Sequence, residues 1–532
     1  MADLILNNGL IFNGTGDAPF SGSIGITGQK IEWVRRGLAP ETNRFIDLNG
    51  FAVAPGFIDG HTHAEGYALG SPGPFLGKLM QGVTTEILGN CGLSVFPIES
   101  GHEQELRDYF GPFTGSYKLS WNWSGLQSLR ENLGGGNLLA NTGSLVGHGS
   151  LRIAAMGFAN RKPNKKELEK MITLLNRAFD EGAVGLSLGL MYPPGLFAEL
   201  DELAALAQVA HQRGRPVTSH MRNETFHLLD SVEEMIQVAS RSGAKVVISH
   251  HKAVGKQNWG KLGESLKMLD EANRQGLEIY IDVYPYTAGN TMLRALLPPW
   301  SLDGGIGKML ERLEDKNSRA EIRTWILDRK DWENLSLAGG WDSIMILSCL
   351  KHHEYEGRYL DELALAAGTE PVDFVMDLIV EEEGQVVMLL FTACEEDLVA
   401  AMKKPYCMIG SDGIPATGRT HPRLHGSFPR FLSKYVLRDK LMSLEEGIRR
   451  ITSLPAQVYN LTDRGTLKEG AYADMVVFDP AQIEDKATYE DPALLPVGVQ
   501  YIFLAGQMAV NRGSFEGHRF GNFIGPGIIE NT

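Results

Sequence analysis

The stretch that decides the fold is Pro55-Gly56-Phe57-Ile58-Asp59-Gly60-His61-Thr62-His63, an apolar segment that ends in two histidines. Because side chains alternate along a strand, residues two apart face the same side, so we expect His61 and His63 to point together. Two imidazoles on one side of a strand end suit a metal ion. An isolated pair of this kind is more often a surface or core pair, so the rest of the chain has to decide.

Seven further apolar stretches follow, separated by polar loops and amphipathic helices. The eight strands are expected at 56–63, 84–91, 138–148, 183–190, 216–220, 245–250, 278–287 and 406–412. Helices are expected at 165–181, 199–213, 225–242 and 262–275, each ending near a glycine. This alternation indicates parallel βα units. Eight strands are the number that closes a (β/α)8 TIM barrel, an α/β fold.

Metal-binding side chains end several of these strands. The second strand ends at Cys91, the fifth at His220, the sixth at His250 and His251, and the eighth at Asp412. Active sites of such barrels assemble at the C-terminal ends of the strands, and imidazole, thiolate and carboxylate are the ligands that select zinc. Strand alternation lets only one of His250 and His251 face inward, and the pattern does not say which. The sequence therefore predicts a zinc site.

The remaining histidines and cysteines carry less information. His148, in the string Leu145-Val146-Gly147-His148-Gly149, also ends a strand, and lining the active site and a core role fit it equally well. Three other cysteines lack metal-binding neighbours and are expected to be small buried apolar residues. They are Cys349, Cys394 and Cys407.

Both ends of the chain have the rhythm of short strands separated by turns. Such strands are expected at 4–6, 10–12, 23–26, 31–34, 45–48 and 52–54, and again at 474–478, 500–504 and 507–511. We therefore expect residues 1–55 and 456–532 to form one small β-sandwich beside a metal-dependent barrel at 56–455.

The connection between the seventh and eighth strands is too long for one βα unit and cannot be structureless in a compact protein. We expect an inserted helical subdomain at about 290–400, with helices at 308–328, 361–367 and 371–382. Because the insertion begins beside the rim of the barrel, we expect it to form a lid over the site. A further helix is expected at 443–452, after the eighth strand.

The composition narrows the class of protein. With 50 basic and 65 acidic residues the net charge is −15, which disfavours nonspecific binding to nucleic acid or to anionic membranes. No stretch approaches the roughly 18 apolar residues of a membrane span. Four cysteines in 532 residues fit a reducing compartment, and the first residues show no leader pattern. We expect a cytoplasmic protein with a small-molecule partner, and a homo-oligomer is compatible with these observations.

Beyond these patterns, the chain resembles the amidohydrolase superfamily, whose opening signature is similar to residues 55–63. Further strings resemble the D-aminoacylases, which are N-acyl-D-amino-acid deacylases. They are GNCG (89–92), GHG (147–149), YPPG (192–195), HMRNE (220–224), SHHK (249–252), DVYPYTAG (282–289), GSDG (410–413) and HPR (421–423). The resemblance runs in order from about residue 50 to 470. GNCG and SHHK are specific to this branch, because many relatives bridge their metals with a carbamylated lysine.

The resemblance implies a role for particular residues. It divides the metal ligands between a tight zinc position, held by Cys91, His220 and His250, and a second, weaker position, held by His61, His63 and Asp412 and bridged by Cys91. It implies that the substrate carboxylate is bound by Lys252, Tyr192, Tyr284 and Arg423, and the candidate substrate residues also include His148 and Asn290. Family members commonly have an aspartate where this chain has Glu65 and a serine where it has Asn290.

These implications describe a zinc-dependent hydrolase. Zinc lowers the pKa of bound water from about 15.7 to about 7, so that metal-bound hydroxide exists near neutral pH. Asp412 is expected to accept the proton of the water and to deliver it to the leaving nitrogen. The expected reaction is hydrolysis of an N-acyl-D-amino acid to a carboxylate and a free D-amino acid.

Two other functions are compatible with this kind of barrel. One is a cyclic amidase of the hydantoinase or dihydroorotase kind, which GNCG and HPR disfavour. The other is a non-catalytic scaffold that has lost its metal. Because this chain keeps every expected ligand, the scaffold is the weaker alternative.

Overall fold

The computed structural model describes residues 2–39, 44–69, 75–114, 118–133, 136–415 and 418–528. Its centre is a sheet of eight parallel strands: β6 (Phe57–Asp59), β7 (Val83–Leu88), β9 (Asn141–Gly147), β10 (Gly185–Gly189), β11 (Val217–His220), β12 (Val246–Ile248), β13 (Ile279–Val283) and β17 (Cys407–Ile409). Their order is β17-β13-β12-β11-β10-β9-β7-β6, which confirms the predicted TIM barrel. All eight strands are shorter than predicted, and five of the six predicted metal ligands follow a strand end, whereas His220 lies within β11.

The first and last strands meet just beyond their ends, at what we call the β6–β17 seam. The Asp412 N–H donates to the His61 carbonyl at 2.8 Å, and the His63 N–H donates to the Gly413 carbonyl at 3.0 Å. Thr62 and Gly413 form a parallel bridge. The barrel therefore closes through residues that the sequence predicts to bind metal.

Helices cover the outside of the barrel where the sequence predicts them: α5 (Lys165–Asp180), α6 (Leu200–Gln212), α7 (Leu228–Ser242) and α8 (Lys261–Arg274). α5 begins at a capping box, in which the Asn164 side chain accepts from the Glu167 N–H at 3.1 Å and the Glu167 carboxylate accepts from the Asn164 N–H at 2.7 Å. α7 ends at Gly243, which adopts a left-handed φ of 72°.

Apolar side chains fill the barrel below the site. One cluster contains side chains from five strands, Ile58, Ile87, Leu145, Val247 and Met408, together with Tyr459. Tyr459 follows α17 (Ser453–Val458), and its hydroxyl donates to the Gly60 carbonyl at 2.8 Å. This packing supports the strand ends from below.

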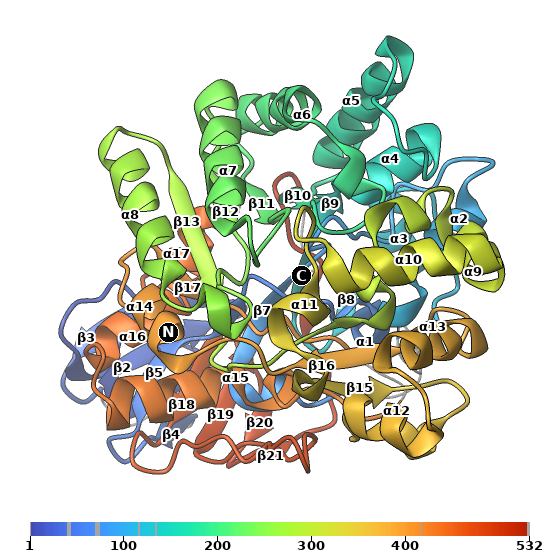
Figure 1. Ribbon diagram of the computed structural model, residues 1–532. Coiled ribbons are helices and arrows are strands. Elements are labelled where there is room, and N and C mark those ends of the chain that lie inside the picture. The colour runs from blue at the N-terminus through green and yellow to red at the C-terminus, as the bar shows by residue number, and fades with distance from the viewer. Residues whose placement is uncertain are drawn as a thin grey trace.

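The two ends of the chain share one mixed sheet, in the place where the sequence predicts a small β-sandwich. Its nine strands are β1 (Leu4–Ile11), β2 (Phe20–Thr27), β3 (Lys30–Arg36), β4 (Phe45–Asp47), β5 (Ala52–Pro55), β18 (Met475–Phe478), β19 (Val499–Leu504), β20 (Gln507–Asn511) and β21 (Ser514–Phe515). β5 pairs antiparallel with β18, so strands from opposite ends of the colour scale lie side by side in Figure 1. Val53 and Val477 pack in the core of this sheet, whereas Ala54 and Val476 pack in the barrel core.

Two details of the terminal segments differ from the expectation. The stretches 4–6 and 10–12 belong to one strand, β1, whose pairing shifts between Leu6 and Gly9, where Asn8 has a φ of 58°. After β21 the chain returns to the barrel, where β22 (Gly521–Asn522) pairs with β8 (Gly136–Leu138). Ile524 then joins the apolar cluster below the site.

The segment between β13 and β17 has an apolar core of its own. Its helices are α9 (Gly305–Glu314), α10 (Lys316–Asp328), α11 (Leu335–Gly339), α12 (Leu360–Ala367), α13 (Pro371–Glu381) and α14 (Glu395–Met402). The single helix expected at 308–328 is wrong, because the chain breaks at Asp315. That residue is extended (φ −77°, ψ 122°), and its carboxylate accepts from the Ser318 N–H at 2.8 Å to begin α10.

The insertion also contains a sheet, so it is not purely helical. β14 (Gly289–Met292) and β15 (Ile344–Ser348) pair antiparallel with β16 (Val387–Leu390), which lies between them. β14 begins directly after the seventh barrel strand and its turn, so this small sheet stands beside the C-terminal ends of the barrel strands (Figure 1).

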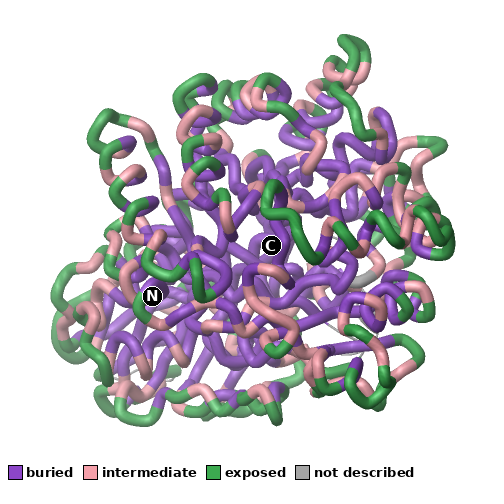
Figure 2. The backbone as a smooth tube through the Cα atoms, viewed as in Figure 1, coloured by how far each residue is buried: buried purple, intermediate pink, exposed green. Residues whose placement is uncertain are grey.

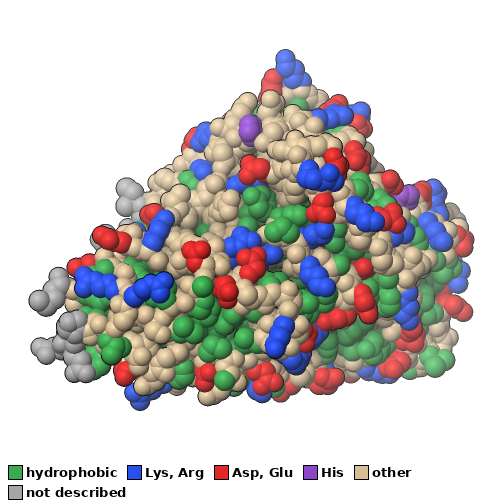
Figure 3. Space-filling model, turned by 90° about the vertical axis from the view of Figure 1, so that its left-hand side faces the viewer, with side chains coloured by type: hydrophobic (Ala, Val, Ile, Leu, Met, Phe, Trp, Pro, Cys, Tyr) green, Lys and Arg blue, Asp and Glu red, His purple; other side chains and the backbone are tan. Residues whose placement is uncertain are grey.

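Burial follows this architecture. Figure 2 shows buried backbone through the barrel and its sheet, with exposed segments in the outer helices and loops. On the face shown in Figure 3, acidic and basic side chains are interspersed. Within the described ranges, the helices are all too short or too polar to cross a membrane.

Candidate metal centre

The predicted metal ligands converge above the barrel. Each comes from a strand end: His61 and His63 follow β6, Cys91 follows β7, His220 ends β11, His250 follows β12 and Asp412 follows β17. All are buried. Their donor atoms form two groups, each with its atoms within 4.8 Å of one another: His61, His63, Cys91 and Asp412, and Cys91, His220 and His250. Cys91 is common to both groups.

Short distances connect the two groups. The Cys91 Sγ lies 3.4 Å from the His61 Nε2 and 3.7 Å from the His250 Nε2. The His250 Nε2 lies 2.8 Å from the His220 Nδ1. The Asp412 Oδ1 lies 3.4 Å from the Nε2 atoms of both His61 and His63. Lone pairs from imidazoles, a thiol and a carboxylate thus face common points, which fits zinc.

Left-handed turns aim three of these side chains. Cys91, His250 and Asp412 have φ values of 52°, 37° and 47°, although none is glycine. Such backbone is costly for residues with a Cβ and is concentrated at functional sites. The turn after β12 separates the neighbouring histidines. His250 reaches the cluster, whereas the His251 Nε2 lies 2.8 Å from the Ser265 hydroxyl.

The GNCG loop crosses the end of β9 and brings Cys91 close to β10, which lies two strands from β7 in the sheet. Gly92 passes so near β10 that a Cβ at this position would lie 2.6 Å from the Gly189 nitrogen. The Gly89 N–H donates to the buried Glu65 carboxylate at 2.7 Å. Glu65, which stands where the family commonly has aspartate, therefore supports the loop that carries Cys91.

The electrostatics of the site favour a bound cation. Burial raises the pKa of Cys91 and of Asp412, but His61 and Arg423, respectively, outweigh it and hold both pKa values well below their usual range. Burial lowers the pKa of His63, yet hydrogen bonds to Asp412 and Cys91 raise it to about 9. The anionic groups thus hold protons on the imidazoles, and a metal ion competes with protons for these lone pairs.

Two carboxylates contact the outer nitrogens of the proposed histidine ligands. Neither of them has a role predicted from the sequence. The Asp282 Oδ1 lies 3.0 Å from the His61 Nδ1 and accepts from the His250 N–H at 2.7 Å. Glu224 reaches the His250 Nδ1 at 3.0 Å and the Lys252 Nζ at 2.5 Å. Both residues lie in the strings DVYPYTAG and HMRNE. Carboxylates on the outer nitrogen of a ligand histidine fix its tautomer and orientation.

Four of the candidate substrate residues line a small cavity of about 50 Å³ against the cluster: Tyr192, Lys252, Tyr284 and Asn290. The Tyr192 hydroxyl is 2.9 Å from the Thr291 hydroxyl. We call this space the inner cavity.

The structure separates Arg423 and His148 from the inner cavity. Arg423 lies behind it, with its Nη2 2.9 Å from the Asp412 Oδ2 and hydrogen-bonded to Asn290. Its Nε and Nη1 are buried without a partner among the described residues. The His148 Nε2 lies 2.8 Å from Glu202, which also pairs with Arg152, and His148 is not among the residues that line the inner cavity. We therefore leave His148 out of the proposed site.

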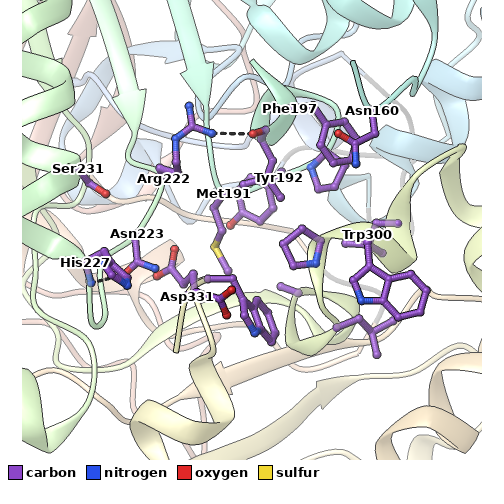
Figure 4. A pocket seen from close by; sticks show the side chains of 18 of the residues that line it. Asn160, Met191, Tyr192, Phe197, Arg222, Asn223, His227, Ser231, Trp300 and Asp331 are labelled. Carbon is purple, nitrogen blue, oxygen red and sulfur yellow. Dashed lines mark hydrogen bonds between the residues drawn. The ribbon is translucent and has the colours of Figure 1, made fainter. Parts of the chain in front are cut away.

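A second and much larger cavity of about 780 Å³ lies between the barrel loops and the insertion. Figure 4 shows Met191 and Tyr192 together in this space, between Arg222 and Trp300. We call it the outer cavity.

Comparisons with known proteins agree with this geometry. Residues 44–510 match the amidohydrolase family. The chain is 33% identical to an N-acyl-D-glutamate deacylase of Alcaligenes xylosoxydans xylosoxydans, over 95% of this chain and 93% of that protein. It is 31% identical to a D-aminoacylase of the same organism, over 98% and 97% of the two chains.

The fold is also similar to those of solved structures. The N-acyl-D-glutamate deacylase of Bordetella bronchiseptica, complexed with zinc and a phosphonate inhibitor, has a TM-score of 0.82 at 32% identity, over 98% of this chain and 99% of that one. A D-aminoacylase has a TM-score of 0.81 at 30% identity, with the same coverage. With this agreement over nearly its whole length, the chain belongs to the amidohydrolase family, in its D-aminoacylase branch.

Proposed function

We propose that the protein hydrolyses the amide bond of N-acyl-D-amino acids, giving a carboxylate and a free D-amino acid, with zinc as its metal. The observation that carries the proposal is the pair of buried donor groups that share Cys91 at the mouth of the barrel. The solved N-acyl-D-glutamate deacylase with zinc and a phosphonate inhibitor supports it.

The donor set fits two metal positions. Cys91, His220 and His250 would hold the tighter zinc, and His61, His63 and Asp412, with Cys91 as the bridge, would hold a second, weaker one. Zinc, when bound, lowers the pKa of water and polarises a carbonyl. Because Asp282 and Glu224 fix the outer nitrogens of His61 and His250, the protein itself sets the orientation of the ligands.

Asp412 is proposed as the group that moves the proton. It is ionised at neutral pH, because Arg423 first and His61 next stabilise its charge against burial. Its Oδ1 faces the two histidines of the β6 end, so a water molecule there lies within reach. The carboxylate accepts the proton of the water and returns it to the departing nitrogen.

The carboxylate of the substrate is proposed to bind in the inner cavity. The Lys252 ammonium supplies the charge, and the Tyr284 hydroxyl and the Asn290 amide, whose Nδ2 has no partner among the described residues, supply hydrogen bonds. Arg423 adds positive charge from behind, with its Cζ 4.4 Å from the centre of the Tyr284 ring. A carboxylate held by these groups leaves the amide beside the metal ligands.

The experiment uses N-acetyl, N-formyl and N-succinyl amino acids of both hands, with released amine as the readout. We expect D substrates to be hydrolysed and the purified protein to contain zinc. Asp412→Asn should lower kcat by about 10²- to 10⁴-fold. Asp270→Asn changes a carboxylate that pairs with Lys404 outside the site, and it serves as the control. An active Asp412→Asn enzyme would exclude Asp412 as the base, and ring opening of hydantoins without amine release would replace the proposed substrate class.

A further inference from the structure

The outer cavity is far larger than the substrate described so far requires. Its volume of about 780 Å³ lies in the range that holds a drug-sized ligand. Much of its wall is apolar and aromatic, and includes Phe158, Phe197, Leu297, Trp300, Ile306 and Trp325. Barrel loops supply one side of this wall, and the segments around α9 and α10 supply the other.

The two cavities meet at three residues. Met191, Tyr192 and Glu333 line both, so the two cavities adjoin at these residues, which we call the neck. By contrast, Lys252 and Tyr284 line the inner cavity and not the outer one. A substrate whose carboxylate is anchored in the inner cavity therefore extends through the neck.

Most charged side chains of the outer cavity already have partners, but the Oε2 of Glu333, where the two cavities adjoin, is buried without a partner among the described residues. Arg222 pairs with Glu234 at 2.8 Å, and Arg294 donates to the Gly384 carbonyl at 3.0 Å. Asp230 pairs with His227 at 2.9 Å. Because the paired groups satisfy one another or the backbone, the surface left for a ligand away from Glu333 is chiefly hydrocarbon. Recognition in this space is then hydrophobic.

We propose that the outer cavity is a subsite for an extended apolar acyl chain, so that N-acyl-D-amino acids with medium or long alkanoyl groups are better substrates than their acetyl counterparts. The inference rests on the proposed function. The size of the outer cavity favours the acyl group over the amino-acid side chain as its occupant. Amino-acid side chains are limited in length, whereas an alkanoyl chain is not. Tyr192 and Met191 hold the first carbons, and the aromatic wall holds the rest.

The size of the effect follows from the burial of methylene groups. Each fully buried methylene stabilises the complex by about 0.8 kcal/mol, which is roughly a fourfold change in affinity. Chains from acetyl to octanoyl should therefore lower KM stepwise, by up to fourfold for each added carbon that reaches the outer cavity. The rise in kcat/KM should level off once the chain fills the space.

The test compares N-acetyl, N-butanoyl, N-hexanoyl, N-octanoyl and N-decanoyl derivatives of one D-amino acid by released amine. Ala295→Phe narrows the outer cavity from its half-buried wall position. It should reduce the octanoyl-to-acetyl ratio of kcat/KM by at least tenfold. Ala366→Phe, on the exposed side of α12, is the matched control and should leave the ratio unchanged.

The outcomes separate the two proposals. If the acetyl substrate is hydrolysed but kcat/KM does not rise with chain length, the acyl subsite is wrong and the proposed function stands. If none of the series is hydrolysed, the proposed function fails, and calorimetry with octanoate and the two variants still decides whether the cavity binds alkyl chains. A preference for short acyl groups on acidic amino acids that Arg294→Met abolishes would overturn the acyl assignment in favour of the amino-acid side chain.

Discussion

Cys91 shows how much the site depends on single residues. Its sulfur belongs to both donor groups, and its backbone is held in a left-handed turn by the close approach of Gly92 to β10 and by the Glu65 carboxylate. Two other proposed ligands, His250 and Asp412, also pass through left-handed turns. Backbone of this kind persists only where the surroundings hold it, so the strain is localised where the chemistry is proposed.

The carboxylate of Glu224 links the metal ligands to the substrate pocket, since it contacts both His250 and Lys252. Glu224→Gln should weaken zinc binding by about 10- to 100-fold, because the amide no longer fixes the charge and tautomer of His250. Competition with a chromogenic chelator measures the change. Glu234→Gln, at a residue of α7 whose carboxylate pairs with Arg222, is the control, and an equal loss in both variants would contradict the assignment.

Glu86, on β7, connects pH with stability. Burial, partly opposed by Lys78 and by a hydrogen bond from Tyr67, raises its pKa to about 7. The folded pKa exceeds the unfolded value of about 4.3. The contribution of protonated Glu86 to the free energy of unfolding is therefore fully present below about pH 4.3 and is lost as the pH rises towards about 7. The loss amounts to about 4 kcal/mol. Urea unfolding at pH 5 and pH 8 should show a smaller difference in Glu86→Gln than in the parent, and equal differences would contradict the assignment.

At the scale of elements, local signals in the sequence were sufficient for the barrel. Glycines near the helix ends, such as Gly243, and the spacing of apolar stretches predicted α5 to α8 and all eight strands. Strand alternation predicted that His61 and His63 share a side. It did not predict the left-handed turns, because a turn after the last strand residue resets the direction of each side chain. The choice of His250 over His251 therefore rested on the resemblance alone.

The insertion was predicted less well. β15 and β16 are short apolar runs that pair across a long stretch of chain, and periodicity does not distinguish such runs from buried helix. The break between α9 and α10 follows from the cap at Asp315, a local signal that the length of the charged run concealed. Asp282 and Glu224 were within quoted strings, but only the fold brings their carboxylates to His61 and His250.

The β6–β17 seam depends on a buried charge cluster. The Lys78 ammonium contacts Asp59 on β6 and the Ser411 hydroxyl after β17, and both charged side chains are nearly inaccessible. Lys78→Met leaves the Asp59 carboxylate buried without its cation, so the free energy of unfolding should fall by about 3–5 kcal/mol. Denaturant titration measures it. Lys308→Met removes an exposed ion pair with Glu311 and should change stability by less than about 1 kcal/mol. Unaltered stability in Lys78→Met would show that the pair does not hold the seam.

At the scale of the whole molecule, metal binding and folding are coupled. The ligands come from five strand ends spread along the chain, so the site exists only when the barrel is closed. Under the proposed function, zinc at about 100 times its Kd adds about 2.7 kcal/mol to the folded state. Thermal unfolding with and without chelator should therefore differ in Tm, and Cys91→Ser should remove most of the difference.

Protons oppose this stabilisation. The pKa values of His63 and His250 are raised to about 9 in the metal-free site, and the negative groups responsible include Asp412 and Cys91 for His63 and Glu224 and Cys91 for His250. Zinc must displace these protons, so its affinity should fall as the pH is lowered from 8 to 6. Chelator competition across this range checks the sign, and an affinity independent of pH would contradict it.

The main-chain hydrogen bond between His61 and Asp412 closes the barrel, and these are residues proposed to take part in the hydrolysis. If the two strand ends separate by the width of a water molecule, Asp412 moves away from the imidazoles of His61 and His63. The rest of the barrel core remains packed during such a local opening. Turnover therefore depends on a closed barrel, and the enzyme loses activity before the whole protein unfolds.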